Sequence, residues 1–281
     1  MALLGDIAPI EAVLNRPHGL LEGPRIGAGG EAVYSDVIGG GVWACPPEGP
    51  VRELLGKRRG IGGIVAHADG GWVFSGRTLV HLQPDGAQRE LLGEEGARGY
   101  NDLASTPRGG LLAGVLRYRP LAGEPAVPGA LIELAPGGGV TVLSEDVVWP
   151  NGIGLAPDAA TVYVSDYSRG VVLALATDGG EAEDFCSVPQ GSADGLAVDG
   201  EGGVWVALGE GGGVARFHAD GRLHEQVDLP ASFVSSISFG GKDMRDVLIS
   251  TADNGVRPEL GGTLLRARSA VPGLPLAPVR V

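Results

Sequence analysis

The stretch PNGIGLAPDAATVYVSD, residues 150–166, contains the unit that decides the fold of this chain. In it, Asn151 stands 11 residues before an apolar strand that begins at Val162 and ends in Ser165 and Asp166. This unit occurs six times, always with a loop residue 9 to 11 positions before the strand. The strands begin at Ala32, Trp72, Gly110, Val162, Val204 and Val247, and the loop residues are Glu22, Gly62, Asn101, Asn151, Asp194 and Ser236. The strand starts are 40, 38, 52, 42 and 43 residues apart, and a period of about 40–50 residues built from short strands is typical of a β-propeller.

This repeat predicts an all-β chain that forms a six-bladed β-propeller, with one four-stranded blade per repeat. Asp-Gly pairs such as Asp69-Gly70 and Asp178-Gly179 favour hairpin turns between the strands, because these residues accept positive φ angles. No linker or change of composition divides the chain, so residues 1–281 are expected to form a single domain. The one helix expected is short, from Pro9 to Leu14, with proline in its first turn.

The charge and apolar pattern exclude several classes of partner. Asp and Glu number 34 against 21 Lys and Arg, a net charge of −13, whereas nucleic-acid binding needs clustered positive charge. No stretch reaches the ~18 apolar residues of a membrane span, and the N-terminus lacks the basic region of a secretory signal. We therefore expect a cytoplasmic protein that binds neither nucleic acid nor membrane. The two cysteines, Cys45 and Cys186, fit no metal or redox spacing and are expected to be free thiols.

Equivalent positions of every blade face the propeller axis, so the in-register loop residues should converge there. Any one of Glu22, Asn151 and Asp194 alone is more simply interpreted as a turn residue, but the three in register favour a central site. They supply only hard oxygen donors, which select Ca²⁺, Mg²⁺ or Mn²⁺ over zinc or copper. Calcium is the first choice, because loop oxygens from separate blades suit its flexible coordination. The sequence thus predicts a central metal site.

The longest interval contains a surplus segment, RYRPLAGEPAVPG, residues 117–129. A long loop on a rigid scaffold often carries function, so this segment is expected to cover the central site as a lid. The alternative is a neutral surface insertion.

Other chemistries leave little trace in the sequence. A G-x-S-x-G nucleophile elbow and a Walker loop are absent, and His224-Glu225 lacks the second histidine of a zincin. His67, His218 and His224 lie beside the expected hairpin turns and are expected to be surface or edge residues.

In the segments that contain the in-register residues, the chain resembles the family of six-bladed propellers that contains senescence marker protein (regucalcin), gluconolactonase and luciferin-regenerating enzyme. The likeness covers nearly the whole chain. The matching segments are Glu22-Gly-Pro-Arg25 with Tyr34-Ser-Asp36, Asn101-Asp102, Pro150-Asn-Gly152 with Tyr163-Val-Ser-Asp166, Ala193-Asp-Gly-Leu-Ala197 with Val204-Trp-Val-Ala207, and Phe239-Gly-Gly241.

This resemblance implies that Glu22, Asn151 and Asp194 are divalent-metal ligands and that Asn101 contacts the metal or the substrate. The segment with Arg117, Tyr118 and Glu124 resembles the loop that caps the substrate in active members. The sugar lactonases of the family carry an Arg two positions before the Asn that matches Asn101. Here that position is Gly99, with Arg98 one residue away, which leaves a less polar lactone open as the substrate.

The expected function is hydrolysis of a lactone ring by a metal-dependent enzyme, with Asp194 as the catalytic base toward water. The expected cofactor is Ca²⁺, with Mg²⁺, Mn²⁺ and Zn²⁺ as alternatives, and the expected partner is a small-molecule substrate. Three alternatives stay open: phosphotriester or aryl-ester hydrolysis at the same site, a non-hydrolytic isomerisation or ring closure, and a non-catalytic calcium-binding propeller. The sequence indicates no oligomeric state.

Overall fold

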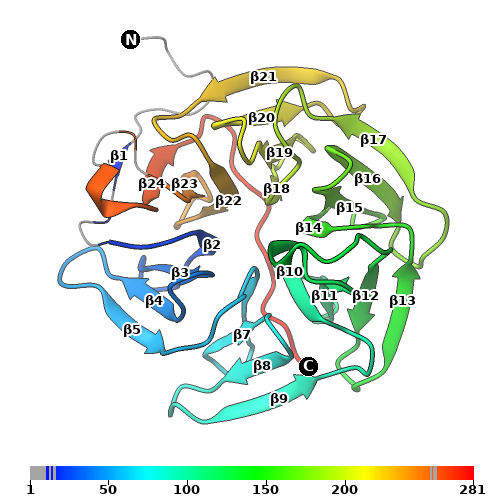
Figure 1. Cartoon of the computed structure of the whole chain (residues 1–281), viewed down its shortest axis with the longest axis horizontal. Helices are drawn as coiled ribbons and strands as arrows, with labels where there is room; N and C mark the ends of the chain where they lie inside the picture. The colour runs from blue at the N-terminus through cyan, green and yellow to red at the C-terminus, as the bar shows by residue number, and fades with distance from the viewer. Residues whose placement is uncertain (1–10, 13, 15–16, 254, 256–257) are drawn as a thin grey trace.

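The computed structural model describes residues 11–12, 14, 17–253, 255 and 258–281. In these residues the strands form six four-stranded antiparallel sheets arranged as the blades of a ring (Figure 1). This confirms the predicted all-β, six-bladed propeller. Whether residues 1–281 form one domain stays a prediction. No helix in the described part of the chain is long and apolar enough to cross a membrane.

The blades follow the chain in order. Blade 1 contains β2 (Leu21–Ile26), β3 (Ala32–Asp36), β4 (Val42–Cys45) and β5 (Arg52–Leu55); blade 2 contains β6 (Ile64–Ala66), β7 (Trp72–Phe74), β8 (Leu79–Leu82) and β9 (Gln88–Leu92); blade 3 contains β10 (Gly99–Ser105), β11 (Leu111–Leu116), β12 (Ala130–Leu134) and β13 (Val140–Ser144). Blade 4 contains β14 (Pro150–Leu155), β15 (Thr161–Asp166), β16 (Val171–Ala176) and β17 (Glu183–Ser187); blade 5 contains β18 (Leu196–Val198), β19 (Val204–Ala207), β20 (Gly213–Phe217) and β21 (Leu223–Asp228); blade 6 contains β22 (Val234–Gly240), β23 (Asp246–Thr251), β24 (Leu264–Arg268) and β1 (Glu11–Ala12).

Blade 6 joins the first and the last strand of the described chain. Its outermost strand is β1, in which Glu11 pairs with Arg266 and Ala12 with Leu265 of β24. The predicted helix from Pro9 to Leu14 is therefore wrong at Glu11 and Ala12, while Pro9, Ile10 and Val13 lie outside the described residues. The physical reason is that β24 offers an unpaired edge, and a helix of only a few residues is unstable by itself.

The second strand of each blade is the apolar strand that the repeat predicted. The observed second strands β3, β7, β11, β15, β19 and β23 begin within one residue of the predicted starts. Of the residues expected in loops before them, Gly62 and Asp194 do precede the innermost strands β6 and β18, whereas the other four lie within strands: Glu22, Asn101, Asn151 and Ser236. Asn101 and Asn151 lie inside the innermost strands β10 and β14, at β-bulges between Tyr100 and Leu103 and between Pro150 and Ile153. A bulge leaves a residue unpaired in the ladder and redirects its side chain, so a residue within a strand still faces the axis.

The hydrophobic core lies between the blades. Each of the six buried clusters combines residues of two neighbouring blades. Between blades 5 and 6, for example, the Trp205 ring meets Phe239 edge-on at 6.2 Å between centroids. Because each blade buries its faces against its neighbours, the ring sets the positions of the innermost strands around the axis.

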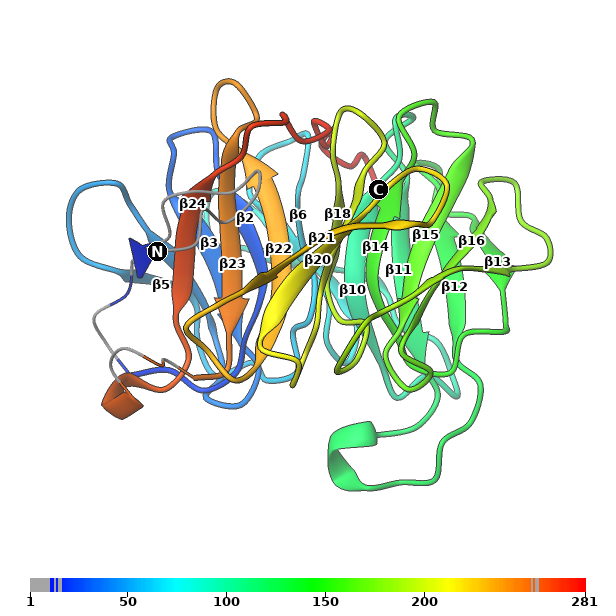
Figure 2. The ribbon, with the colours of Figure 1, turned by 90° about the horizontal axis from the view of Figure 1, so that it is seen from above.

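The two faces of the ring carry different features. The loop of residues 117–129 projects from one face, and the last described residues cross the other (Figure 2). On that second face, Val279 pairs with His67, and the His67 Nε2 lies 3.0 Å from the carbonyl oxygen of Val281. His67 is only 5% exposed and stacks on His81 with 3.8 Å between ring centroids. His67 is therefore not a surface residue, because the crossing segment covers it, although it directly follows β6, an edge strand of its sheet.

Candidate functional site

A cavity of about 460 Å³ opens on the face that carries the 117–129 loop. Its lining includes Glu22, Asn101, Tyr118, Asn151 and Asp194. Five of the seven residues predicted for the site therefore lie together, although they come from four different blades and the segments that lead into them. The other two, Arg117 and Glu124, are not among the lining residues.

Backbone and side-chain hydrogen bonds between neighbouring blades hold the cavity floor. The Asn101 Nδ2 donates to the Pro150 carbonyl at 3.0 Å, and the Gly152 N–H donates to the Asp194 carbonyl at 3.1 Å. The Gly195 N–H in turn donates to the carbonyl of Ser235 at 2.8 Å. The floor is thus linked from blade 3 through to blade 6.

The same ring of contacts continues through the remaining blades. The Ser235 hydroxyl donates to the Leu21 carbonyl at 2.6 Å, and the Ser35 hydroxyl donates to the Ile61 carbonyl at 2.6 Å. Between blades 2 and 3, Gly76 and Tyr100 exchange two backbone hydrogen bonds. Small hydroxyl side chains at strand ends therefore have a positional role, because they satisfy carbonyls where two innermost strands meet.

Two glycines make this close approach of strands possible. A Cβ at Gly152 would overlap the backbone of Gly195 and Leu196, and a Cβ at Gly195 would overlap Ser236. Each glycine directly follows a predicted ligand. A polar residue followed by glycine usually indicates a turn. Here the glycine is required because innermost strands approach so closely that no Cβ atom fits.

The surroundings of the two carboxylates at the floor, Glu22 and Asp194, disfavour their ionised forms. Glu22 is 8% exposed and Asp194 is 2% exposed. Burial raises the pKa of both well above the ordinary carboxyl value, and repulsion by other carboxylates raises it further. A hydrogen bond with the Asn151 amide acts in the opposite direction on the pKa of Asp194. The buried Asp194 Oδ1 has no hydrogen-bond partner, so this oxygen is available to a cation, a proton or a water molecule.

The donor set fits a hard divalent cation. Its oxygens come from the carboxylates of Glu22 and Asp194 and the amide of Asn151, which is the chemistry that calcium and magnesium prefer. Within the described residues, no three His, Cys, Asp or Glu side chains form a metal-binding group. A cation at this floor would therefore need amide oxygen beside the two carboxylates. Asn101 offers a further amide oxygen, because its nitrogen is used by Pro150.

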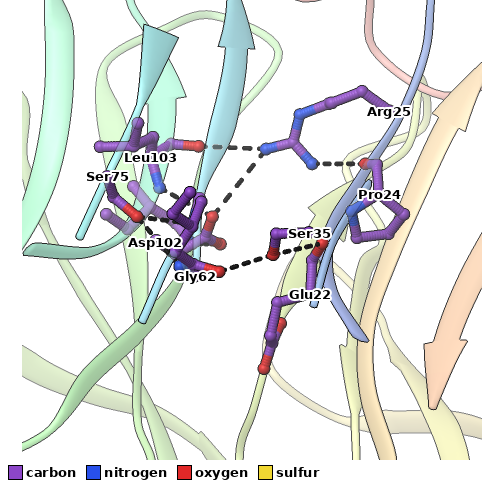
Figure 3. A network of polar contacts seen from close by, with 11 residues as sticks. Glu22, Pro24, Arg25, Ser35, Gly62, Ser75, Asp102 and Leu103 are labelled. Carbon is purple, nitrogen blue, oxygen red and sulfur yellow. Dashed lines mark hydrogen bonds and ion pairs between the residues drawn. The ribbon is translucent and has the colours of Figure 1, made fainter. Parts of the chain in front are cut away.

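Below the floor lies an ion pair that the sequence reasoning did not assign to the site. Asp102 is 5% exposed, and its Oδ1 accepts the Leu103 N–H at 2.7 Å and lies 3.9 Å from the Arg25 Nη2. Arg25 also donates to the carbonyls of Pro24 and Leu103 at 2.8 and 3.1 Å (Figure 3). Burial raises the pKa of Asp102 to about 6, with Arg25 opposing the rise. The signal in the sequence is the position of Asp102 directly after the in-register Asn101.

The loop of residues 117–129 forms one wall of the cavity through Tyr118, Arg119, Pro120 and Leu121. It contains the 3₁₀ helix η1 (Pro120–Ala122). Tyr118 is buried, its hydroxyl lies 3.4 Å from the Ser168 Oγ, and its ring packs edge-on against Trp149 at 6.4 Å between centroids.

The other two residues predicted for this loop are engaged in ion pairs. Arg117 pairs with Glu145 at 2.5 Å, and Glu124 pairs with Arg119 at 3.6 Å while accepting the Arg119 N–H. Their predicted contact with substrate stays a prediction.

The sequence profile described as "SMP-30/Gluconolactonase/LRE-like region" matches residues 20–253. A pentonolactonase of Haloferax volcanii is 28% identical over 228 residues, which cover 78% of this chain and 76% of that protein. A 6-deoxy-6-sulfogluconolactonase of Pseudomonas putida is 27% identical over 284 residues, with 94% of this chain and 96% of that protein covered. Among solved structures, the calcium-binding protein regucalcin of Agrobacterium tumefaciens superposes with a TM-score of 0.84 at 22% identity, with 96% of both chains covered.

Proposed function

Because this chain belongs to the SMP-30/gluconolactonase/LRE-like family, we propose that it is a divalent-metal-dependent hydrolase that opens a lactone ring. The observation that carries the proposal is the pair of buried carboxylates, Glu22 and Asp194, at the floor of an open cavity, with the Asp194 Oδ1 left without a partner. The relatives named as lactonases support the substrate class, since the alignment with one of them covers almost the whole of both chains.

Glu22, Asn151 and Asp194 would hold the metal ion. Calcium is our first choice, with Mg²⁺, Mn²⁺ and Zn²⁺ as alternatives. When bound, a divalent cation supplies Lewis-acid polarisation of the lactone carbonyl and offsets the repulsion of the two carboxylates.

The protein's own groups would perform the proton transfer and the positioning. Asp194 Oδ1 would accept a proton from the attacking water as its oxygen adds to the lactone carbonyl carbon. The acyl C–O bond of the ring then breaks, and the proton passes to the departing ring oxygen, which yields the open hydroxy acid. Asn101 lies on a separate blade at the same floor, where its amide would orient the ring oxygens, while Tyr118 would limit the access of bulk water from the side.

A lactone panel assayed with metal-stripped protein tests this function. We expect hydrolysis of at least one lactone, loss of activity on chelation, and recovery with one of Ca²⁺, Mg²⁺, Mn²⁺ or Zn²⁺. Asp194→Ala should lower kcat by about 100-fold or more, the usual contribution of a general base. Asp178→Asn is a suitable control, because Asp178 is an exposed carboxylate in a turn after β16.

The outcomes separate the remaining alternatives. Hydrolysis of phosphotriesters or aryl esters but of no lactone would assign the same floor to the alternative hydrolase. Tight metal binding without turnover of any of these substrates would overturn the proposed hydrolase in favour of a binding role or a non-hydrolytic reaction.

A further inference from the structure

The wall of the cavity is basic in a chain whose net charge is −13. Four arginines line it, against two carboxylates, Glu22 and Asp194, both at the floor. The four are Arg59, Arg77, Arg98 and Arg119, and all are exposed. The charged groups that line the cavity thus carry an excess of positive charge, which a divalent cation at the floor would increase.

These arginines come from consecutive connections on one side of the ring. Arg59 precedes β6, Arg77 lies between β7 and β8, Arg98 lies between β9 and β10, and Arg119 lies in the 117–129 loop after β11. They therefore form an arc over blades 1 to 3; we call Arg59, Arg77, Arg98 and Arg119 the arginine arc.

Three members of the arc have no ion-pair partner among the described residues: Arg59, Arg77 and Arg98. Several other exposed arginines are paired, whereas Arg52, Arg108 and Arg280 are exposed without an ion pair among the described residues but do not line the cavity. Arg169 lies 3.1 Å from Asp184, and Arg268 lies 2.7 Å from Asp243. Unpaired guanidinium groups gathered at a cavity leave their donors free for a ligand.

The backbone beneath the arc is held in place. Arg58 donates to the Thr78 carbonyl at 2.5 Å, which connects the segment of Arg59 to the loop of Arg77. The Tyr100 N–H donates to the Gly76 carbonyl at 2.7 Å, and the Arg98 N–H donates to the Leu116 carbonyl at 2.6 Å. The loops that carry three of the arginines are thus tied to one another, which lowers the ordering cost of binding.

Acidic groups lie on the opposite side of the same face. Glu210, between β19 and β20, accepts hydrogen bonds from Tyr167 at 3.1 Å and from Ser192 at 2.9 Å. Asp253, after β23, accepts the Ser232 N–H at 2.9 Å. Glu94 and Glu95 lie in the connection that carries Arg98, but they do not line the cavity. The charge that lines the cavity is therefore divided, with arginines on the wall over blades 1 to 3 and carboxylates at the floor.

From this division we infer that the substrate is a lactone that carries an anionic substituent, such as a phosphate, a sulfonate or a carboxylate, and that Arg59, Arg77 and Arg98 bind this substituent. The ring carbonyl would then lie toward Asp194, and the anion toward the arc. A guanidinium recognises such oxyanions by charge-assisted, paired hydrogen bonds. This inference rests on the proposed lactonase function and favours an anionic substrate over the less polar lactone that the sequence left open.

A matched pair of substrates tests it: glucono-δ-lactone and its 6-phosphate, assayed with the metal-loaded protein. We expect a kcat/KM at least about tenfold higher for the phosphate, carried mainly by KM, since each charge-assisted contact is worth more than a neutral one. Raising the salt concentration from 0.05 to 0.5 M should reduce this preference, because salt screens exposed charges. A lactone with a carboxylate in place of the phosphate would show whether the arc selects the charge or the phosphate geometry.

Single Arg59→Gln, Arg77→Gln and Arg98→Gln variants and their triple combination locate the effect. At least two of the single variants should raise KM for the phosphate by about 3-fold or more and leave the neutral lactone within about 2-fold. Arg108→Gln is the control, because Arg108 is an exposed arginine in the β10–β11 turn and does not line the cavity.

Two results would overturn the inference. The first is equal kcat/KM for the neutral and phosphorylated lactones in the wild type and the triple variant, which leaves the lactonase function intact. The second result concerns binding, and it is needed if neither lactone is hydrolysed, which would be a failure of the proposed function. Calorimetric binding of 6-phosphogluconate and gluconate then decides: a preference for the phosphate that the triple variant loses supports the arc, and equal binding of both acids overturns it.

Discussion

The Arg25 Nη2 and the Asp102 Oδ1 lie 3.9 Å apart inside the ring, on the same two strands that carry Glu22 and Asn101. Arg25 follows Glu22 by three residues in β2, and Asp102 follows Asn101 directly in β10. The ion pair therefore couples the positions of a candidate metal ligand and a candidate substrate contact across blades 1 and 3. A substitution in this ion pair should therefore change both the free energy of unfolding and the activity.

Removal of the positively charged Arg25 side chain from this ion pair should destabilise the fold. In Arg25→Met, Asp102 keeps its buried position without a counter-charge, and the Pro24 and Leu103 carbonyls lose a donor. We expect a loss of about 2–4 kcal/mol in the free energy of unfolding near pH 8. Urea unfolding of the wild type and the variant measures it. The loss should be smaller near pH 5, where Asp102 is protonated, and an equal loss at both pH values would contradict this account.

The pKa of Asp102 predicts how stability depends on pH in metal-free protein. Burial raises this pKa to about 6 from an ordinary value of 3.8, so between these values the native state holds more protons than the unfolded state. The contribution of Asp102 to stability is thus greatest at the acidic end and falls by about 2–3 kcal/mol as the pH rises through this window.

An Asp102→Asn variant isolates this contribution, because it does not titrate. Relative to the wild type, the variant should gain stability as the pH rises from 4.5 to 7.5, and Asp178→Asn should show no such trend. A stability difference that stays constant with pH would show that Asp102 is ionised over the whole range.

The Asp194 carboxylate should favour metal binding but lower the stability of the metal-free fold. Asp194→Asn removes one of the two buried carboxylates at the cavity floor, so the metal-free variant should be more stable than metal-free wild type by about 1–3 kcal/mol at pH 8, while its hydrolytic activity is lost. Cation at about 100 times its dissociation constant should add about 2.7 kcal/mol to the wild type and much less to the variant. Thermal unfolding with chelator and with each cation tests both points. A variant that is less stable than the wild type without metal would contradict the repulsion between Glu22 and Asp194.

The Tyr118 ring should matter more than its hydroxyl. The hydroxyl lies 3.4 Å from the Ser168 Oγ, a weak hydrogen bond, whereas the ring packs on Trp149 at the cavity wall. Tyr118→Phe should keep kcat/KM within about threefold, and Tyr118→Ala should raise KM about tenfold through a looser wall. Steady-state kinetics on the same lactone compares the two variants, with Ser168→Ala as the partner control. Equal losses in the Phe and Ala variants would assign the effect to the hydroxyl.

The repeat was predictable because it follows from burial. Each blade buries its second strand, so apolar strands such as those at Val162 and Val204 recur at a regular spacing, and Glu, Asn or Asp stands at four of the six in-register positions before them. The same register predicted that Glu22, Asn151 and Asp194 meet in one cavity. The bulges at Asn101 and Asn151 were not predictable from the pattern, because a bulge changes the pairing of a strand without changing its composition.

Features that depend on ring closure escaped the sequence reasoning. Glu11 and Ala12 form a strand only because β24 is brought to them by the closure of blade 6. Arg59, Arg77 and Arg98 are separate loop residues in the chain, and no periodicity relates them. They share one cavity wall because consecutive loops of neighbouring blades emerge on the same face.

The segment that crosses the second face joins blades that are not neighbours. The Leu274 N–H donates to Val198 of blade 5, Val279 exchanges backbone hydrogen bonds with Ala66 and Ala68 of blade 2, and the Arg280 N–H donates to Gly109 beside blade 3. It therefore acts as a chord across the ring, whereas the six buried apolar clusters join only neighbouring blades. Widening of the ring would require this chord to detach, so the spacing between the blades of Asn101 and Asp194 is restrained from the face opposite the cavity. Slow amide exchange at Val279 and Arg280 would thus report on the rigidity of a site at the opposite end of the axis.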